Sequence, residues 1–384
     1  MPHEVLILGG GALGCAVAAA LAARPDWGGR ITVLERDPQY RQASSALSAA
    51  SIRQQFSTPL NIALSQVGLD LLRRIGPAAA FQPRGYLYLA GTTAQADTLH
   101  ELHAVQRAAG APVQLLDRAA LTARWPWLRT DDLQLGQWGA EGEGWFDGWG
   151  LLMHFKRQAQ AAGVQFVTTE ALSLERHADG SLARVHTPQG PLQADTVVLA
   201  CGAWSGQLAA SAGLDVPVHA KRRSVYAFTS PERAPGCPLV IDADPQTGLW
   251  FRPEGEVFLC GGPPLGADDD DLPLDPEPHL FEERLWPALA HRVPGFETLR
   301  PARAWAGYYE INPFDHNGWV GPLPECPGLL LACGFSGHGL QHAAGVGRGV
   351  AEWIATGTYQ TLDLSPLAPA RLRRGERLVE RNVI

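Results

Sequence analysis

The feature that most constrains the fold is an apolar run followed at once by a glycine-rich turn. The run 5–8 contains only Val, Leu and Ile, which predicts a strand buried on both faces of a parallel sheet. The turn has the spacing Gly9-x-Gly11-x-x-Gly14, and small apolar residues then continue to 23, as in a closely packed helix. The first glycine permits the tight turn, the second lets backbone approach a pyrophosphate, and the third lets the helix pack against the strand.

A second strand completes this unit. Residues 31–34 are mostly apolar and end in Glu35, whose carboxylate can accept hydrogen bonds from a ribose, while the helix N-terminus faces the phosphates. The order of strand, glycines, helix, strand and acid predicts a dinucleotide site. A βαβ unit without a ligand would leave the three glycines and the acid unexplained.

Bulk composition narrows the possible partners. The 384 residues are enough for about two domains, and the net charge of −8 argues against nucleic acid and anionic membranes as partners. The uncharged stretch 5–23 resembles a membrane span, but four glycines interrupt it and no basic residue precedes it. Six cysteines lack CxxC spacing, so we expect no metal or disulfide framework and a cytoplasmic protein.

The rest of the chain alternates between helical and strand-like segments. We expect helices at 61–75, 93–109 and 150–162, strands at 85–90 and 164–167, and a hairpin at 172–187. The run Asp268–Asp271 fits a solvated loop better than a metal site, because no His or Cys joins it. The segment 371–377 predicts a basic surface helix.

Three motifs, spread over nearly the whole chain, resemble one family. They are the glycine motif with Glu35, the segment 194–204 (Ala-Asp-x-Val-Val-x-Ala-x-Gly-Ala-Trp), and Gly-Phe-Ser-Gly-His-Gly at 334–339. Together they resemble the FAD-dependent amine oxidoreductases of the D-amino acid oxidase, glycine oxidase and sarcosine oxidase group. Residues 51–57 are similar to the branch that holds amino-acid dehydrogenase subunits and mitochondrial FAD-dependent oxidoreductase domain-containing proteins.

The resemblance implies an α/β fold. A Rossmann-like FAD-binding domain (1–80, 150–215 and 320–384) would be interwoven with an α+β substrate domain (81–149 and 216–319) built on a mostly antiparallel sheet. It also implies that the cofactor-binding residues are Gly9, Gly11, Ala12, Leu13, Gly14, Glu35, Arg36, Ser44, Ser51, Ile52, Val167, Gly202, Trp204, Gly334, Gly337, His338, Gly339, Leu340 and Gln341. Val167 would meet adenine through its backbone.

Three departures from the family pattern bear on the chemistry. Gly307 stands where monomeric sarcosine oxidases carry the cysteine that bonds FAD, and residues 36–60 lack the histidine that related dehydrogenases use. We therefore expect non-covalent FAD. Trp250 stands where the oxidases keep a lysine that activates oxygen, which favours a dehydrogenase.

The chemistry of arginine, tyrosine and histidine side chains indicates the candidate catalytic residues. Arg53 can hold a substrate carboxylate by two parallel hydrogen bonds, with Arg252 as its rival. Tyr308 and Tyr309 alternate on a strand, so we expect only one to reach the pocket. His338 would contact flavin or substrate, or cap a helix.

These residues predict oxidation of the C–N bond of an amino acid or N-methyl amino acid, by hydride transfer to flavin N5. The electron acceptor and the exact amine stay open, and no acid–base dyad or metal site is evident. Two alternatives remain: an FAD-holding assembly or binding protein without turnover, and an NAD dehydrogenase.

Overall fold

The computed structural model describes residues 2–382. One of its two large sheets has six strands in the order β18-β19-β12-β1-β2-β8. All neighbours are parallel except the β18–β19 pair. The strands are β1 (Glu4–Leu8), β2 (Arg30–Glu35), β8 (Gln165–Thr168), β12 (Thr196–Leu199), β18 (Trp319–Pro322) and β19 (Leu329–Cys333). This is the predicted Rossmann-like sheet.

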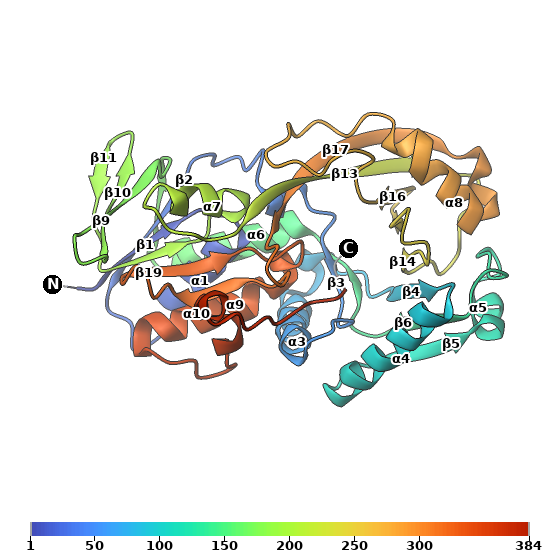
Figure 1. Ribbon diagram of the computed structural model, residues 1–384, viewed down its shortest axis with the longest axis horizontal. Helices are drawn as coiled ribbons and strands as arrows, with labels where there is room; N and C mark the ends of the chain where they lie inside the picture. Colours follow the sequence, from blue (N-terminus) through green and yellow to red (C-terminus); the bar gives the residue numbers. More distant parts are fainter. Residues whose placement is uncertain (1, 383–384) are drawn as a thin grey trace.

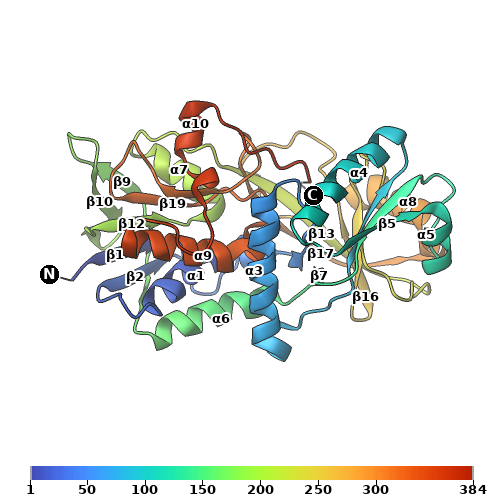
Figure 2. The ribbon, with the colours of Figure 1, turned by 90° about the horizontal axis from the view of Figure 1, so that it is seen from below.

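Both faces of this sheet are covered, as its unbroken apolar strands require. Alternate strand residues such as Ile7 and Val33 pack against the helical layer that covers one face (Figure 2). Gly347 lets two of these helices touch, because a Cβ there would overlap Ala16. The helices are α1 (Ala12–Ala22), α3 (Pro59–Ile75), α6 (Gly148–Ala161) and α9 (Gly339–Thr356).

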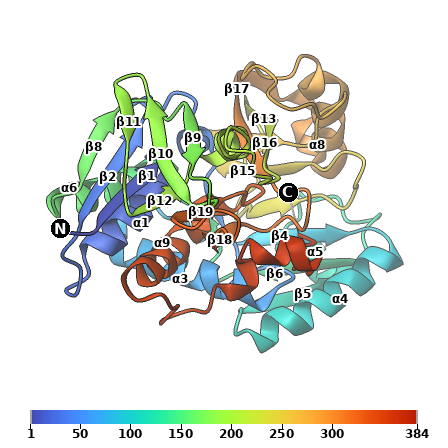
Figure 3. The same ribbon diagram turned by 60° about the vertical axis from the view of Figure 1, so that its left-hand side comes forward.

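The opposite face is covered by a small antiparallel sheet and a short helix (Figure 3). Leu6 and Leu8 of β1 pack there against Leu174 and Val185. The hairpin expected at 172–187 is therefore confirmed. The elements are β9 (Ser173–Arg176), β10 (Leu182–Thr187), β11 (Gly190–Leu192), η2 (Gly202–Trp204) and α7 (Ser205–Ala210).

The second large sheet has eight strands in the order β17-β13-β16-β15-β14-β4-β6-β5. It is antiparallel except between β14 and β4, so the predicted mostly antiparallel sheet is confirmed. Its strands are β4 (Tyr86–Ala90), β5 (Val113–Asp117), β6 (Leu135–Gly139), β13 (His219–Thr229), β14 (Leu239–Ile241), β15 (Trp250–Glu254), β16 (Val257–Gly261) and β17 (Arg300–Ile311). The helices beside it are α4 (Thr93–Ala108), α5 (Arg118–Arg124), η3 (Phe281–Leu285), α8 (Trp286–Arg292) and η4 (Pro294–Thr298).

Strands β13 and β17 form a long paired ribbon that runs from the six-stranded side of the molecule into the eight-stranded side (Figure 1). Strands of the two sheets alternate along the chain, as two interwoven domains require. The remaining short elements are α2 (Ser44–Leu47), β3 (Ser51–Ile52), η1 (Gly76–Ala79), β7 (Gly144–Trp145), η5 (Ser365–Leu367) and α10 (Ala370–Arg374). No helix in 2–382 is long and apolar enough to cross a membrane.

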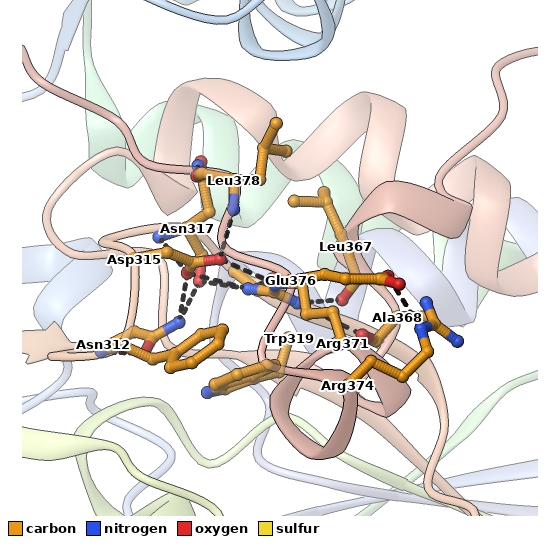
Figure 4. A network of polar contacts seen from close by, with 12 residues as sticks. Asn312, Asp315, Asn317, Trp319, Leu367, Ala368, Arg371, Arg374, Glu376 and Leu378 are labelled. Atoms are coloured by element: carbon orange, nitrogen blue, oxygen red, sulfur yellow. Dashed lines mark hydrogen bonds and ion pairs between the residues drawn. The ribbon is translucent and has the colours of Figure 1, made fainter.

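The predicted basic surface helix differs from the one observed. Helix α10 forms, but Arg371 is buried and donates to both oxygens of Asp315, at 2.8 and 3.0 Å (Figure 4). Asp315 Oδ2 also accepts from the backbone N–H of Leu378, at 3.1 Å. This buried network fixes the chain that follows α10.

The acidic run forms ion pairs with β13. Asp268 pairs with Arg223 at 2.8 Å, and Asp270 pairs with Lys221 at 2.7 Å. These carboxylates therefore hold their loop to the sheet through neighbouring cations.

Candidate active site

A long cavity of about 930 Å³ lies between the carboxyl ends of the parallel strands and the β13–β17 ribbon. Such crevices at the carboxyl ends of parallel strands are the usual ligand sites of this kind of sheet. One end is lined by the glycine motif and the other by strands β4 and β14. We call these the cofactor end and the substrate end.

The glycine turn leaves no room for side chains at two positions. A Cβ at Gly9 would overlap Ala200 O, and Gly9 has a φ of +98°. A Cβ at Gly14 would overlap Gly9 O, so Gly14 brings α1 against the turn and does not itself line the cavity.

Glu35 is held in place by backbone. Its Oε2 accepts from Gly10 N at 2.8 Å, and its Oε1 accepts from Asp37 N at 2.9 Å. The carboxylate lines the cavity and can still accept from hydroxyl groups through its remaining lone pairs.

The N-terminus of α1 opens into the cavity. Gly11, Ala12 and Leu13 line it, and Ala12 N donates to Ser45 Oγ at 3.1 Å. The first turn of α1 contains no acidic residue. Free N–H groups and the positive end of the helix dipole make this an anion site that suits a pyrophosphate.

The part of the cofactor end that lies farthest from the substrate end is formed by loops that follow strands of the six-stranded sheet. Arg36 stacks 4.0 Å above the Trp204 ring, and Gly202 has a φ of +56°. Val167 lies outside the lining, because β8 ends at Thr168 and the chain meets the cavity only from Thr169 to Leu172. The structure therefore does not place Val167, the expected adenine contact, in the cavity wall.

The turn before α9 lines the middle of the cavity, with Ser336 to Gln341 in its wall. Gly334 lies behind it, where its N–H donates to Glu310 Oε2 at 2.9 Å. Glu310 lines the cavity, and burial raises its pKa to about 7. Sequence reasoning missed Glu310, which follows two tyrosines on β17.

Arg53 lies at the substrate end. Its side chain is 4% exposed and lies 4.0 Å above the Phe56 ring. The guanidinium donates to two carbonyls, Gln55 O at 2.7 Å and Asn382 O, and no described Asp or Glu forms a salt bridge with it. Ser44 and Ser51 line the same cavity, whereas Ile52 is buried behind it.

Arg252, the alternative candidate for binding the substrate carboxylate, does not fit that role. It lies outside the cavity lining, pairs with Glu254 and donates to Ala49 O at 2.7 Å. Burial lowers the pKa of Arg252. The expectation of a catalytic Arg252 is therefore wrong: the side chain shares a face of β15 with the cavity-lining Trp250, but its guanidinium is held by Glu254 and lies over the Trp145 ring.

Both tyrosines of β17 line the cavity, which corrects the expectation that only one would reach it. Tyr308 Oη donates to Leu272 O at 2.6 Å, and its ring meets Trp204 edge-on. Tyr309 packs against Gly337. The cavity therefore extends along both faces of this strand, and Tyr308 belongs to the cofactor end rather than the catalytic centre.

His338 lies at the N-cap of α9 without a side-chain capping bond, so the capping role is excluded. Its Nε2 is buried without a hydrogen-bond partner, and its ring meets Phe56 edge-on at 5.5 Å. Burial holds its pKa well below the usual range, so the imidazole is neutral. His342 lies behind it, and a hydrogen bond of 3.1 Å joins His342 Nε2 to Ser65 Oγ.

Sequence reasoning also missed the aromatic wall of the substrate end. Tyr86 and Tyr88 stack with ring centroids 6.2 Å apart, and Trp250 faces the same space. Tyr88 Oη is buried without a partner. The alternation Tyr-Leu-Tyr on β4 could have revealed this wall, because residues two apart on a strand share a face.

A second missed residue is Glu143, on the loop before β7. It is fully buried and accepts from Gln54 N at 2.6 Å and from Gln55 Nε2 at 2.7 Å. Burial raises its pKa to about 8, although Arg53 nearby lowers it. Gly139 makes room for this carboxylate, since a Cβ there would overlap it.

Comparison with known proteins decides the family. The family model described as FAD dependent oxidoreductase matches residues 4–353. The chain belongs to this family. It is 38% identical over 99% of its length to FAD-dependent oxidoreductase domain-containing protein 1 of Xenopus laevis, and covers 85% of that protein.

Two further relatives of this FAD-dependent oxidoreductase carry the names of enzymes. Glycine oxidase of Geobacillus kaustophilus is 27% identical, over 96% of this chain and 97% of that protein. The crystal structure of L-proline dehydrogenase from P. horikoshii is 25% identical with a TM-score of 0.86, and the match covers 98% of this chain and all of that one. The family's cofactor is FAD, and the glycine turn, open helix N-terminus and Glu35 fit it.

Proposed function

We propose that this protein oxidises the C–N bond of an amino acid or N-methyl amino acid. The observation that carries the proposal is Arg53, a buried cavity-lining arginine with no described carboxylate partner. A buried charge needs a counter-charge, and a substrate carboxylate would supply it. The names of the glycine oxidase and L-proline dehydrogenase relatives support this substrate class.

The cofactor would be held without a covalent bond. Glu35 would bind the adenosine ribose, the α1 N-terminus would bind the pyrophosphate, and the turn before α9 would support the flavin. When bound, FAD supplies the hydride acceptor. Gly307 and the histidine-free segment 36–60 offer no thiol or imidazole for attachment, so acid precipitation should release all the flavin as FAD.

The chain's own groups would bind and orient the substrate. Arg53 would hold the carboxylate, and the aromatic wall of Tyr86, Tyr88 and Trp250 would exclude water. His338 adds no positive charge because it is neutral, so a substrate with a neutral amine meets no like charge from that ring. Orientation of this kind supplies much of the catalysis in flavin enzymes.

We propose further that the enzyme is a dehydrogenase. Trp250 stands where the oxidases keep a lysine, and it lines the cavity. Reduced protein should therefore react slowly with oxygen, and an artificial acceptor dye should outpace oxygen in turnover. Rapid peroxide formation in air, matching the dye rate, would contradict this.

The experiment that tests the proposal is anaerobic mixing with a panel of amino acids, N-methyl amino acids and the corresponding amines without a carboxylate. Bleaching of the flavin by carboxylate-bearing members alone is the expected result. Bleaching by amines alone would contradict the substrate class. A bound flavin that no amine reduces would favour the alternative, an FAD-holding assembly protein, which the domain-containing name of the 38% identical relative allows.

A further inference from the structure

Arg53 is oriented by a segment that lies far away in the sequence. One of its two nitrogen–carbonyl contacts is to Gln55 O, in its own loop, and the other is to Asn382 O. Asn382 follows α10, in the chain that runs to the centre of the molecule beside β3 (Figure 1). We call residues 378–382 the tail segment. The direction of the guanidinium depends on it.

A buried carboxylate fixes the tail segment. Glu380 is 1% exposed. It accepts from Ser57 N at 2.9 Å, Ser57 Oγ at 2.8 Å, Asn61 Nδ2 at 2.9 Å and Asn382 N at 3.0 Å. The last bond links the carboxylate directly to the residue whose carbonyl meets Arg53. No described Lys, Arg or His forms a salt bridge with Glu380, so it is held by neutral donors.

The beginning of the segment is held independently. Leu378 N donates to Asp315 at 3.1 Å and Leu378 O accepts from Asn317 Nδ2. Asp315 is itself fixed by Arg371 (Figure 4). With both ends bound, the segment is an ordered part of the fold.

The tail segment also forms part of the cavity wall. Arg381 and Asn382 line the cavity together with Arg53 and Tyr88. Asn382 Nδ2 donates to Gln55 O at 2.9 Å, so the same carbonyl that meets Arg53 is tied to the tail. The segment therefore borders the place where a substrate carboxylate would bind.

We propose that the tail segment is a positioning element of the substrate site, and that Glu380 acts by placing Asn382 O against Arg53. This inference rests on the proposed function. Two carbonyl oxygens can orient a guanidinium without neutralising its charge, which leaves that charge for an incoming carboxylate. A carboxylate in their place would have cancelled it.

The test is Glu380→Gln in the FAD-loaded protein, with Glu376→Gln as the matched control. Glutamine keeps the size of the side chain, but it offers one acceptor oxygen where Glu380 uses two: Oε1 accepts from Ser57 and Asn382, and Oε2 accepts from Asn61. The remaining amide oxygen is uncharged, so it holds Ser57 and Asn382 more weakly than the carboxylate does. Glu376 is exposed, and within residues 2–382 its one salt bridge is with Arg374. Titration calorimetry with benzoate and with uncharged benzamide is the measurement.

We expect Glu380→Gln to weaken benzoate binding roughly tenfold, the equivalent of about 1.4 kcal/mol, with benzamide binding, FAD content and the control unchanged. A merely structural role would weaken both probes together, and that result would overturn the inference. If Glu380→Gln binds benzoate as the wild type does and Arg53→Ala does not bind it, the positioning role of the tail segment is overturned. The proposal that Arg53 binds the substrate carboxylate would then still stand. If the wild type fails to bind benzoate, the proposed function falls and the inference with it. Should Glu380→Gln lose FAD, Ser57→Ala is tested by the same criteria.

Discussion

The two ends of the cavity are built in different ways. At the cofactor end, backbone N–H groups hold Glu35 and the α1 N-terminus opens into the cavity. At the substrate end, side chains from distant segments converge, among them Arg53 and Tyr88, together with the tail segment. Backbone donors remain when most side chains are changed, although a Cβ at Gly9 or Gly14 would overlap backbone. Substitution of a single ligand-facing side chain should therefore weaken binding less at the cofactor end than at the substrate end.

The largest expected effect separates two buried arginines. Arg53→Ala should cost roughly 2–5 kcal/mol in transition-state binding, since it leaves a substrate carboxylate unpaired in a dry pocket. Arg252→Ala should leave substrate binding unchanged and lower the free energy of unfolding by roughly 1–3 kcal/mol, since it removes a buried side chain that lies over Trp145 and takes the donor from Ala49 O. Flavin reduction rates against substrate concentration measure the first, and urea unfolding measures the second. If both substitutions lowered the rate of flavin reduction equally, the structure would no longer distinguish a substrate-binding Arg53 from a structural Arg252.

At the cofactor end, Glu35→Ala should weaken FAD binding by roughly 1.5–3 kcal/mol, because a charge-assisted hydrogen bond to ribose is lost. Glu35→Gln should fall between wild type and Glu35→Ala, since it keeps one acceptor. Flavin fluorescence on titration of the FAD-free protein gives the dissociation constants. Unchanged affinity in Glu35→Ala would remove this residue from the site.

Glu143 should make the stability of the fold sensitive to pH. Its pKa is raised from 4.5 to about 8, so the folded protein keeps a proton that the unfolded chain releases. Stability conferred by that proton is complete below pH 4.5 and is lost as the pH rises through 8. Glu143→Gln removes the dependence, so relative to wild type it should gain roughly 1–3 kcal/mol between pH 5 and pH 8.5.

Urea unfolding of wild type and Glu143→Gln at both pH values provides the measurement. The exposed Glu141 lies in the same loop, so Glu141→Gln is the matched control and should follow wild type. Parallel stability curves for wild type and Glu143→Gln would show that this carboxyl does not titrate in the window.

The smallest effect concerns one hydroxyl beside the anion site. Ser45 Oγ accepts from Ala12 N, which leaves its own proton free for a phosphate oxygen. Ser45→Ala should weaken FAD binding by only roughly 0.5–1.5 kcal/mol, because the helix N–H groups remain. A loss as large as that of Glu35→Ala would contradict the idea that backbone dominates this end.

Most of the residues predicted for the cofactor site line the cavity, and so does Arg53, whereas sequence reasoning missed the aromatic wall of the substrate end. Gly9, Gly11 and Glu35 lie within one βαβ unit, where spacing along the chain becomes spacing in space. Val167 lies outside the cavity lining because strand ends are not fixed by propensity. Arg252 lies outside it although Trp250 shares its face of β15, because its guanidinium is held by Glu254 and Ala49 O, and no local pattern predicts those contacts.

Local order along the chain thus determined the nucleotide-binding unit and the three motifs, and the family resemblance of those motifs implied the second, mostly antiparallel sheet. Tertiary structure decided which arginine meets the cavity, that Glu143 and Glu310 are buried, and that residues 378–382 reach Arg53. The physical reason is how far apart along the sequence the interacting residues lie. A βαβ motif is specified by neighbours a few residues apart, whereas the contact between Arg53 and Asn382 joins residues 329 apart, and no local pattern records it.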